Sequence, residues 1–492
     1  MQRINSRTSN SFFVFLFSGM VAISAHAEQS KVNPIPPTVT PIGKAAPQSP
    51  LKYRELAKSI LAEFVAIDTT NSKGSTTKLA EAAKKRLIDA GFDSKEIHII
   101  QSPNTARKGN LVVGLQGTDS ALKPLLLTAH IDVVEVNPSD WALPPFEFNE
   151  KNGVFYGRGV EDDKDEAAIY LANLIRFKQE GYRPKRSIVV ALTTDEEGGG
   201  ENGIDLLLKD HPDLVNAAFV FNEGGGGKLN QSGQRTINGV QAAEKQFQNF
   251  TFEVKDRGGH SSRPREQNAI RELSAALAKI STTFVPVKLN DVTRGYLERS
   301  SSVLSEENGK AAKALATNPN DVQAINQLSK DSALNAVIRS TCTPTLISGG
   351  HASNALPEKA TATVNCRLVP GDTPQYILTL LKQTVANPHV DIQLAHDELK
   401  PSPPSPVTGQ ILKDIEKVSH EMWANIPVVP TMGTGATESS KFRALGIPAY
   451  GVSGLFYGDE TGQHGINERI PAQSFYEGQE FLYRLTKLVS SK

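Results

Sequence analysis

The stretch LLLTAHID, residues 125–132, carries the pattern on which the fold assignment rests. Leu125–Ala129 is apolar except for one threonine, as in a strand that is buried on both faces. His130 and Asp132 follow at once, so polar side chains stand at the carboxyl end of this strand. Other stretches with the same buried-strand pattern are Leu111–Leu115, Ser187–Thr193 and Ala217–Phe221.

Predicted helices accompany these strands. Leu51–Ile67 places its apolar residues on one stripe, and residues 78–90 form a second helical segment that ends at Gly91, a residue type that commonly terminates helices. A third helix is predicted over Glu166–Gln179. Because strands that alternate with helices are typical of a parallel-rich sheet, we predict an α/β domain with helices on both faces of a mixed sheet.

The pattern changes near residue 240. Phe247–Val254 alternates apolar and polar residues, like an antiparallel strand with one exposed face, and residues 283–337 form a polar, partly helical insertion. The other elements predicted here are helices Asn268–Ile280 and Pro374–Val385 and strands Val337–Ile347, Ala360–Leu368 and Val390–Leu394. We therefore predict a small α+β module, residues 240–398, inserted between the two parts of the α/β domain, residues 51–239 and 399–492.

The first 50 residues are predicted to lie outside these domains. Arg3 and Arg7 precede an apolar run of 12 residues at 12–23 and the small-residue site AHA at 25–27, which is the form of a secretory signal peptide. This run is shorter than the ~20 residues that span a membrane. We expect cleavage after residue 27 and export to the periplasm or the medium. Residues 28–50 contain six prolines and are predicted to be an extended linker.

Composition excludes several classes of protein. The 492 residues hold 53 basic and 53 acidic side chains, and this zero balance argues against nucleic-acid binding, which needs a basic surface. Apolar residues make up 39% of the chain, which favours a large folded core over disorder. Two cysteines cannot supply a zinc site built from four thiolates.

Histidines and carboxylates gather after the predicted strands. They are His130 and Asp132, Glu161–Asp163, Asp195–Glu197, Glu223 and His464. Because ligand sites in open α/β sheets lie beyond the carboxyl ends of the strands, we expect these groups to share one pocket. Two histidines with several carboxylates suit zinc bound through nitrogen and oxygen. More carboxylates are present than one ion needs, which favours two metals about 3.5–4 Å apart that share an aspartate.

Each fragment alone has a plainer explanation. A single His-x-Asp is commonly a surface or capping pair, and the acidic run at 161–166 is commonly a solvated helix start. This run lacks the glycine and glutamate of a calcium-binding loop. Glycines 224–227 with Lys228 lack the Ser or Thr of a phosphate-binding loop. The order and placement of all the fragments together favour a metal site.

The motifs taken together resemble a known family. They are His130-x-Asp132, Tyr156-Gly-Arg-Gly-x-x-Asp162-Asp-Lys164, Asp195-Glu-Glu197-Gly, Asn222-Glu-Gly-Gly225 and His464-Gly-x-Asn-Glu468. Over about residues 51–490 the chain resembles the co-catalytic zinc amidohydrolases, which include carboxypeptidase G, aminoacylase, carnosinase and acetylornithine deacetylase/succinyl-diaminopimelate desuccinylase. The Asp-Asp-Lys form and the stretch Trp141-x-x-Pro-Pro-Phe146 are most similar to the carboxypeptidase S and N-acyl-amino-acid hydrolase branch. The chain departs from the family at Asp165, usually glycine, and at Glu438, often aspartate.

The resemblance implies a role for each matching residue. The first Zn²⁺ would be held by His130, Asp162 and Glu223, and the second by Asp162, Glu197 and His464, with Asp162 bridging the two. Co²⁺ or Mn²⁺ could substitute for Zn²⁺. Asp132 would orient His130. Glu196 would act as general base and later protonate the leaving amine.

For the inserted module, the resemblance implies a lid, or dimerisation, domain. His260 would stabilise the oxyanion of the tetrahedral intermediate, and in dimeric family members this histidine reaches the partner's site. Asn354 and Arg367 would grip the carboxylate and carbonyl of the substrate, and Gly435 would belong to a glycine-rich substrate loop. The implied partners are a small peptide or N-acyl amino acid and a second copy of the chain bound through the lid.

Cys342 and Cys366 lie on two predicted strands of the module, each 12 residues from position 354. A hairpin that turns at this position could bring them together as a disulfide, which an exported protein can form. Two free buried thiols are the alternative.

The leading prediction is a di-zinc carboxypeptidase or dipeptidase. The alternative is an aminoacylase-like N-acyl-amino-acid amidohydrolase on the same site. A non-catalytic binding protein is less favoured, because it would be expected to have lost Glu196 or a ligand. A serine hydrolase is disfavoured because neither Ser261 nor Ser262 lies in a Gly-x-Ser-x-Gly elbow.

Overall fold

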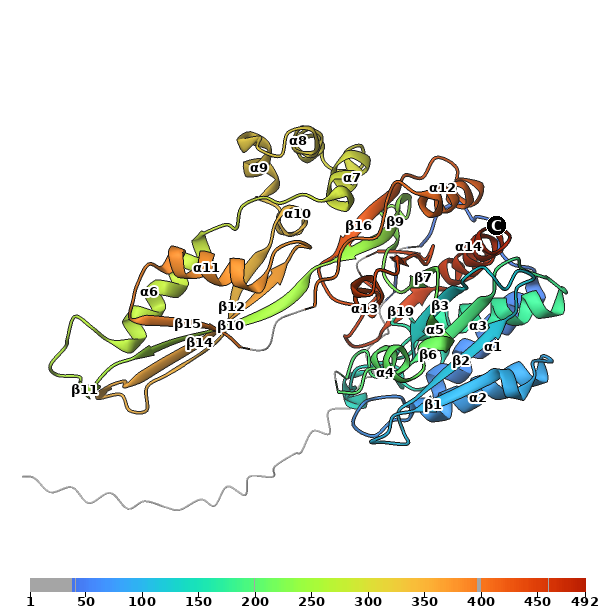
Figure 1. Ribbon diagram of the computed structural model, residues 1–492, viewed down its shortest axis with the longest axis horizontal. Coiled ribbons are helices and arrows are strands. Elements are labelled where there is room, and N and C mark those ends of the chain that lie inside the picture. The colour runs from blue at the N-terminus through green and yellow to red at the C-terminus, as the bar shows by residue number, and fades with distance from the viewer. Residues whose placement is uncertain (1–37, 40, 199, 396–399, 459) are drawn as a thin grey trace, which may run out of the picture. The chain divides into compact units, whose positions relative to one another are not determined.

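The computed structural model describes residues 38, 39, 41–198, 200–395, 400–458 and 460–492. The predicted signal peptide, residues 1–27, lies outside this described part. Among the described residues, a larger α/β domain is interrupted by a smaller α+β domain (Figure 1), which confirms the predicted fold class. None of the helices among the described residues has the length and apolar character that a membrane crossing requires.

Ten strands of the described residues form the sheet of the larger domain, in the order β1-β2-β6-β3-β7-β17-β9-β8-β18 with β16 paired to β9. They are β1 (Ile97–Gln101), β2 (Gly109–Leu115), β3 (Leu125–His130), β6 (Ile188–Thr193), β7 (Phe219–Asn222), β8 (Gly226–Leu229), β9 (Arg235–Glu244), β16 (Val428–Gly433), β17 (Ala449–Gly451) and β18 (Phe456–Tyr457). Strand β3 pairs in parallel with β6 and β7, whereas β2 is antiparallel to β1 and β6. The carboxyl ends of β3, β6 and β7 therefore meet at one edge of the sheet.

Apolar side chains leave this sheet on both faces. Leu125 and Leu127 of β3 enter the larger core, whereas Leu126 enters a second core on the opposite face. The helices of the larger core are α1 (Leu51–Ala66), α2 (Thr76–Asp89), α3 (Lys164–Gln179), α12 (Gln410–Met422) and α14 (Ala472–Ser490), and those of the second core are α4 (Gly203–Asp210), α5 (Pro212–Val215) and α13 (Ser439–Ala444). Burial on both faces explains the continuous apolar run of β3.

The described part of the predicted linker is extended and lies against the larger domain. Val39 packs with Val154 and Tyr156, and Ser49 Oγ donates a hydrogen bond to the Glu480 carboxylate at 2.9 Å. The remaining short elements of this domain are the strands β4 (Asn149–Lys151), β5 (Val154–Tyr156) and β19 (Arg469–Pro471) and the 3-10 turns Ser94–Glu96 and Pro138–Asp140.

The smaller domain is built on an antiparallel sheet in the order β12-β14-β10-β15. Its elements are β10 (Gln246–Lys255), β11 (Gly259–His260), α6 (Ala269–Thr282), β12 (Thr341–Gly349), β13 (Ala355–Leu356), β14 (Lys359–Leu368), α11 (Pro374–Val385) and β15 (Val390–Leu394). Helices α6 and α11 lie beside this sheet (Figure 1). Phe250 and Phe252 of β10 pack with Leu273 of α6 and Ile377 of α11. The alternating pattern of this strand follows from having one face covered.

A helical insertion in the smaller domain has its own core and corrects one prediction. It consists of α7 (Asp291–Ser300), α8 (Glu306–Thr317), α9 (Val322–Leu328) and α10 (Ser332–Ile338). Val337 was predicted to begin a strand but belongs to α10. The Asp331 carboxylate caps this helix by accepting hydrogen bonds from two backbone N–H groups, and Leu334 and Ile338 share its buried face. Strand β12 begins later, at Thr341.

The junction between the two domains lies at Lys245 rather than at residue 240. Strand β9 pairs with β16 as far as Glu244, so this residue still belongs to the sheet of the larger domain. Strand β10 begins at Gln246 and pairs with β14. The predicted boundary fell inside β9 because one extended segment of chain contributes a strand to each sheet.

Cys342 and Cys366 form a disulfide that joins β12 to β14 at directly paired positions. This observation decides between the disulfide and the two free thiols that the sequence left open.

We expect the double substitution Cys342→Ser with Cys366→Ser to lower the free energy of unfolding of the smaller domain by about 2–4 kcal/mol, the usual effect of a disulfide. Urea unfolding followed by circular dichroism measures this loss. The wild-type chain unfolded in dithiothreitol should match the double variant. Equal midpoints for the oxidised wild type and the double variant would contradict the expectation.

Candidate metal centre

The five predicted metal ligands come from different connections of the larger domain. His130 ends β3, Asp162 lies between β5 and α3, Glu197 follows β6, Glu223 follows β7, and His464 lies between β18 and β19. Because β3 is parallel to both β6 and β7, the residues that follow these strands meet at one edge of the sheet.

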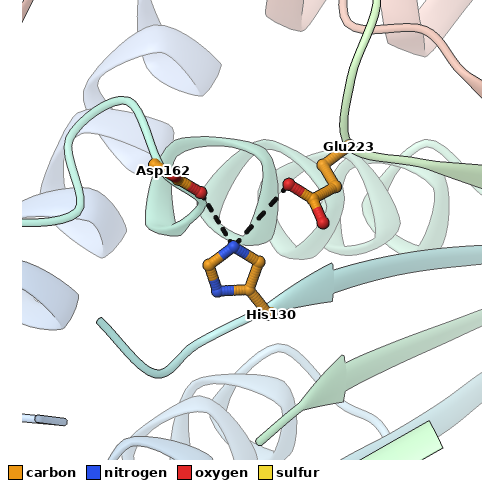
Figure 2. Close-up of side chains that lie close together, drawn as sticks. All are labelled: His130, Asp162 and Glu223. Carbon is orange, nitrogen blue, oxygen red and sulfur yellow. Dashed lines mark hydrogen bonds and ion pairs between the residues drawn. The ribbon is translucent and has the colours of Figure 1, made fainter. Parts of the chain in front are cut away.

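The first group consists of His130, Asp162 and Glu223. Nε2 of His130 lies 2.8 Å from Oδ1 of Asp162 and 3.8 Å from Oε2 of Glu223, so both carboxylates face the same imidazole nitrogen (Figure 2). One ligand atom from each residue lies within 4.8 Å of the other two. One nitrogen and two carboxylate oxygens suit a divalent ion such as zinc.

The second group consists of Asp162, Glu197 and His464. Nε2 of His464 lies 2.9 Å from Oδ2 of Asp162 and 2.7 Å from Oε1 of Glu197. Asp162 therefore offers one oxygen to each group, as a bridging carboxylate must. The structure brings the five residues together in the two predicted groups. Metal binding by them stays a prediction.

The centre holds a carboxylate oxygen for which the described part of the protein supplies no partner. Oε1 of Glu223 is buried and has no hydrogen-bond partner among the described residues, and burial raises the pKa of this carboxyl well above its usual range. Burial alone lowers the pKa of His130, but the hydrogen bond with Asp162 and the charge of Glu223 outweigh it and raise this pKa. These side chains therefore fit a pair of divalent cations.

Asp132 makes contacts through both its side chain and its main chain, and its role of orienting His130 stays a prediction. Its carboxylate accepts hydrogen bonds from the backbone N–H groups of Glu196 at 3.1 Å and Glu197 at 3.0 Å. Nδ1 of His130 instead lies 3.1 Å from the backbone carbonyl of Asp132 and 3.8 Å from its carboxylate, which is beyond hydrogen-bond distance. The Asp132 carboxylate thus holds the loop that carries Glu196 and Glu197, and its backbone carbonyl lies beside the ring of His130.

Glu196 is half-buried and lines a cavity of about 790 Å³. The predicted ligands that line the same cavity are Asp162, Glu197, Glu223 and His464. Burial raises the pKa of Glu196 to about 8, with a further rise from the charges of Glu438 and Glu197 and an opposing effect of His130. A carboxyl with such a pKa can take up and release a proton near neutral pH, as a general base must.

Glycine-rich backbone forms much of the cavity wall. Gly433–Thr437, which includes the predicted substrate-loop residue Gly435, lines it at the end of β16. Gly224 and Gly225 line it after β7. At Gly225, φ is +75° and an added Cβ would lie 2.4 Å from the carbonyl oxygen of Gly451, so only glycine fits there.

The three remaining predicted residues, His260, Asn354 and Arg367, lie in the smaller domain and do not line this cavity. Nδ1 of His260 accepts hydrogen bonds from the hydroxyl and the backbone N–H of Ser262, which assigns the ring proton to Nε2. Arg367 is half-buried, with its guanidinium 5.6 Å from the ring centre of Phe247. The roles of these three residues stay predictions.

Glu468 is a functional residue to which the sequence analysis assigned no role. It is fully buried, and its carboxylate accepts hydrogen bonds from the N–H groups of Gly159 at 3.0 Å, Glu161 at 2.9 Å and Asp162 at 3.2 Å. Arg158 donates to it at 2.7 Å. Glu468 therefore holds the loop that presents Asp162. Its place at the end of the His-Gly-x-Asn-Glu motif was the available signal.

Comparisons with known proteins agree with this geometry. The model of peptidase family M20/M25/M40 matches residues 126–488. The chain is 29% identical over 432 residues to the N-fatty-acyl-amino acid synthase/hydrolase PM20D1 of Mus musculus, covering 85% of this chain and 84% of that protein. It is 29% identical over 402 residues to the probable carboxypeptidase S-like 2 of Dictyostelium discoideum, covering 80% of this chain and 76% of that protein. The fold is similar to the M20 family metallo-carboxypeptidase Sso-CP2 from Sulfolobus solfataricus, with a TM-score of 0.62, 18% identity and coverage of 88% and 98%.

We expect Glu468→Ala to lower the free energy of unfolding by about 3–5 kcal/mol, because it leaves the buried Arg158 guanidinium without its only carboxylate partner among the described residues. Urea unfolding of the metal-free protein measures the change. The control is Glu150→Ala, which breaks a partly exposed ion pair with Lys58 and should cost less than about 1 kcal/mol. Equal losses in the two variants would show that Glu468 does not have this role.

Proposed function

Because the chain belongs to peptidase family M20/M25/M40, we propose that it is a carboxypeptidase or dipeptidase. It hydrolyses an amide or peptide bond in small substrates that carry a free carboxylate, and it uses two Zn²⁺ ions per subunit. The observation that carries the proposal is the pair of ligand groups that share Asp162. Glu196 lies beside them in one cavity, where a base is needed.

Two ions bound by these groups would polarise the substrate carbonyl and lower the pKa of water toward ~7. The protein supplies the proton transfers. Glu196 takes a proton from the attacking water and returns it to the nitrogen of the leaving amine. The Glu196 carboxyl holds the proton between these two steps.

The smaller domain supplies the groups that recognise the substrate. The Arg367 guanidinium suits a carboxylate because its planar donors match the two oxygens. Nε2–H of His260 can donate to the developing oxyanion, since Ser262 occupies Nδ1. Asn354 adds an amide donor for the substrate carbonyl. A free carboxylate required at this position limits the enzyme to the ends of peptides.

The second candidate is hydrolysis of N-acyl amino acids. The resemblance to the mammalian N-fatty-acyl-amino acid synthase/hydrolase over 85% of the chain favours it. Among the described residues that line the cavity, the larger apolar side chains are Leu455 and Tyr457. We therefore expect dipeptides and short acyl groups to be better substrates than long fatty acyl chains.

We also propose that the chain is exported and forms a homodimer through the smaller domain. The Cys342–Cys366 disulfide supports export to an oxidising compartment, which N-terminal sequencing of the secreted protein would test.

On β12, an edge strand of the smaller sheet, Leu346 and Ile347 are exposed by 68% and 66%, which supports a dimer interface there. Sedimentation equilibrium would measure the oligomeric state.

A panel of dipeptides, short N-acyl amino acids, long-chain N-acyl amino acids and carboxyl-blocked analogues tests the proposed function. We expect hydrolysis of the first two sets, at least ~10-fold weaker activity on blocked analogues, and loss of activity after exhaustive chelation. Zn²⁺ added back should restore it. Full activity in the metal-free protein would overturn the mechanism, and full activity on blocked analogues would overturn the carboxylate requirement.

We expect Glu196→Gln to lower kcat by about 10²–10⁴-fold, the usual contribution of a general base, while the bound metal content stays unchanged. Steady-state kinetics and metal analysis of the purified variant measure both quantities. Glu421→Gln, on an exposed position of α12, is the matched control and should leave kcat unchanged. A Glu196→Gln variant with wild-type turnover would exclude the assigned role.

A further inference from the structure

Asp195 occupies an unusual place directly before Glu196. Its backbone φ is +62°, in the left-handed region that non-glycine residues rarely adopt. Its side chain is 1% exposed and does not line the large cavity. The Asp195 carboxylate therefore lies outside this cavity, and its contacts serve the loop itself.

Lys108, which stands directly before β2, is the partner of this carboxylate. Its Nζ donates a hydrogen bond to Oδ1 of Asp195 at 2.7 Å, across 87 residues of sequence. Among the described residues, Lys108 is the only cation whose nitrogen lies within 4.0 Å of the Asp195 carboxylate. The other oxygen of Asp195 accepts hydrogen bonds from the backbone N–H groups of Gly200, at 3.0 Å, and Glu201.

Two carboxylates thus hold the same loop. The Asp132 carboxylate accepts hydrogen bonds from the N–H groups of Glu196 and Glu197. The Asp195 carboxylate, which is paired with Lys108, accepts them from the N–H groups of residues 200 and 201. Lys108, Asp132 and Asp195 also line a second cavity of about 10 Å³. A space of this size admits at most one water molecule. These groups therefore act on the loop and not on the substrate.

Residues of β2 and α2 hold the start of the loop at Thr194. The backbone N–H of Thr194 donates to Oδ1 of Asn110 in β2 at 3.0 Å, and the hydroxyl of Thr76 in α2 donates to that of Thr194 at 2.8 Å. At Gly198, an added Cβ would lie 2.2 Å from Oδ1 of Asp195, so the chain passes close to this carboxylate. The loop is built around the Asp195 carboxylate.

From these contacts we propose that Lys108 is a positioning residue for hydrolysis, which fixes Glu196 through Asp195. Without the ammonium group, a buried carboxylate loses its counter-charge and turns toward water, because an unpaired buried charge is costly. The backbone on which Glu196 stands then moves with it. A displacement of about 1 Å at a catalytic group can cost ~10²-fold in rate. This inference rests on the proposed function.

The test compares Lys108→Met, Lys108→Arg and Lys85→Met in the full-length protein, at saturating Zn²⁺ and with a dipeptide that the wild type hydrolyses. Lys85 is the matched control, because it forms an exposed ion pair with Asp89. We expect Lys108→Met to lower kcat about 10–100-fold with KM within about twofold. Lys108→Arg should recover kcat to within about threefold of the wild type, and Lys85→Met should match the wild type.

Three results would overturn the inference. The first is a Lys108→Met variant with kcat within about twofold of the wild type. The second is a Lys108→Met variant in which both kcat and the thermal unfolding midpoint fall, together with a Lys108→Arg variant that does not restore kcat. This result would show a structural role alone. The third is a fall in the bound zinc content of Lys108→Met that matches its loss of kcat, which would place the effect on metal binding. If the wild type is active and Glu196→Gln is not, any of these results concerns Lys108 and leaves the proposed function standing.

Discussion

Burial of negative charge at one edge of the larger sheet is the constraint on which this structure depends. The carboxylates there fall into two sets with different partners. Asp162, Glu197 and Glu223 face one another and two imidazoles, and Oε1 of Glu223 has no hydrogen-bond partner among the described residues. Asp132, Asp195 and Glu468 instead accept hydrogen bonds from backbone N–H groups. A buried carboxylate is stable when such donors or a cation surround it. The first set is therefore suited to metal, and the second set holds the loops that present the first.

The loops show the conformational consequence of this arrangement. Asp195 and His464 both have φ near +60°, and a residue in such a conformation costs about 1–3 kcal/mol. Such conformations persist where the surroundings determine them. Around Asp195 the surroundings are the Lys108 ammonium and the N–H groups of its own loop. The geometry that a metal centre and a general base require is thus held mainly by hydrogen bonds outside the cavity.

The sequence predicted the elements with a strong burial pattern and missed features that depend on distant partners. The strand at Leu125 was found because burial on both faces leaves a continuous apolar run. The run at 161–166, typical of a solvated surface, is in fact mostly buried, because its last three residues begin α3 and the buried Glu468 carboxylate binds the backbone N–H groups of its first two. The His-x-Asp spacing led to the prediction that Asp132 orients His130 but does not say which oxygen faces the ring, and in the structure the backbone carbonyl of Asp132 lies there. Lys108 carried no signal at all, as its partner lies 87 residues away.

The sequence by itself indicated four buried strands of the larger sheet, the inserted α+β module, and the five residues that lie together in the two groups. Local patterns suffice for these features, because each segment shows the spacing of apolar residues that its helix or strand requires, and parallel strands end at a common edge. The tertiary structure decided that Asp162 turns one oxygen to each histidine, that Cys342 meets Cys366, and that the domains join at Lys245. These outcomes depend on strand register and on how loops close in space. Register and loop closure fix the distance between groups far apart in the chain, and no local pattern contains that distance.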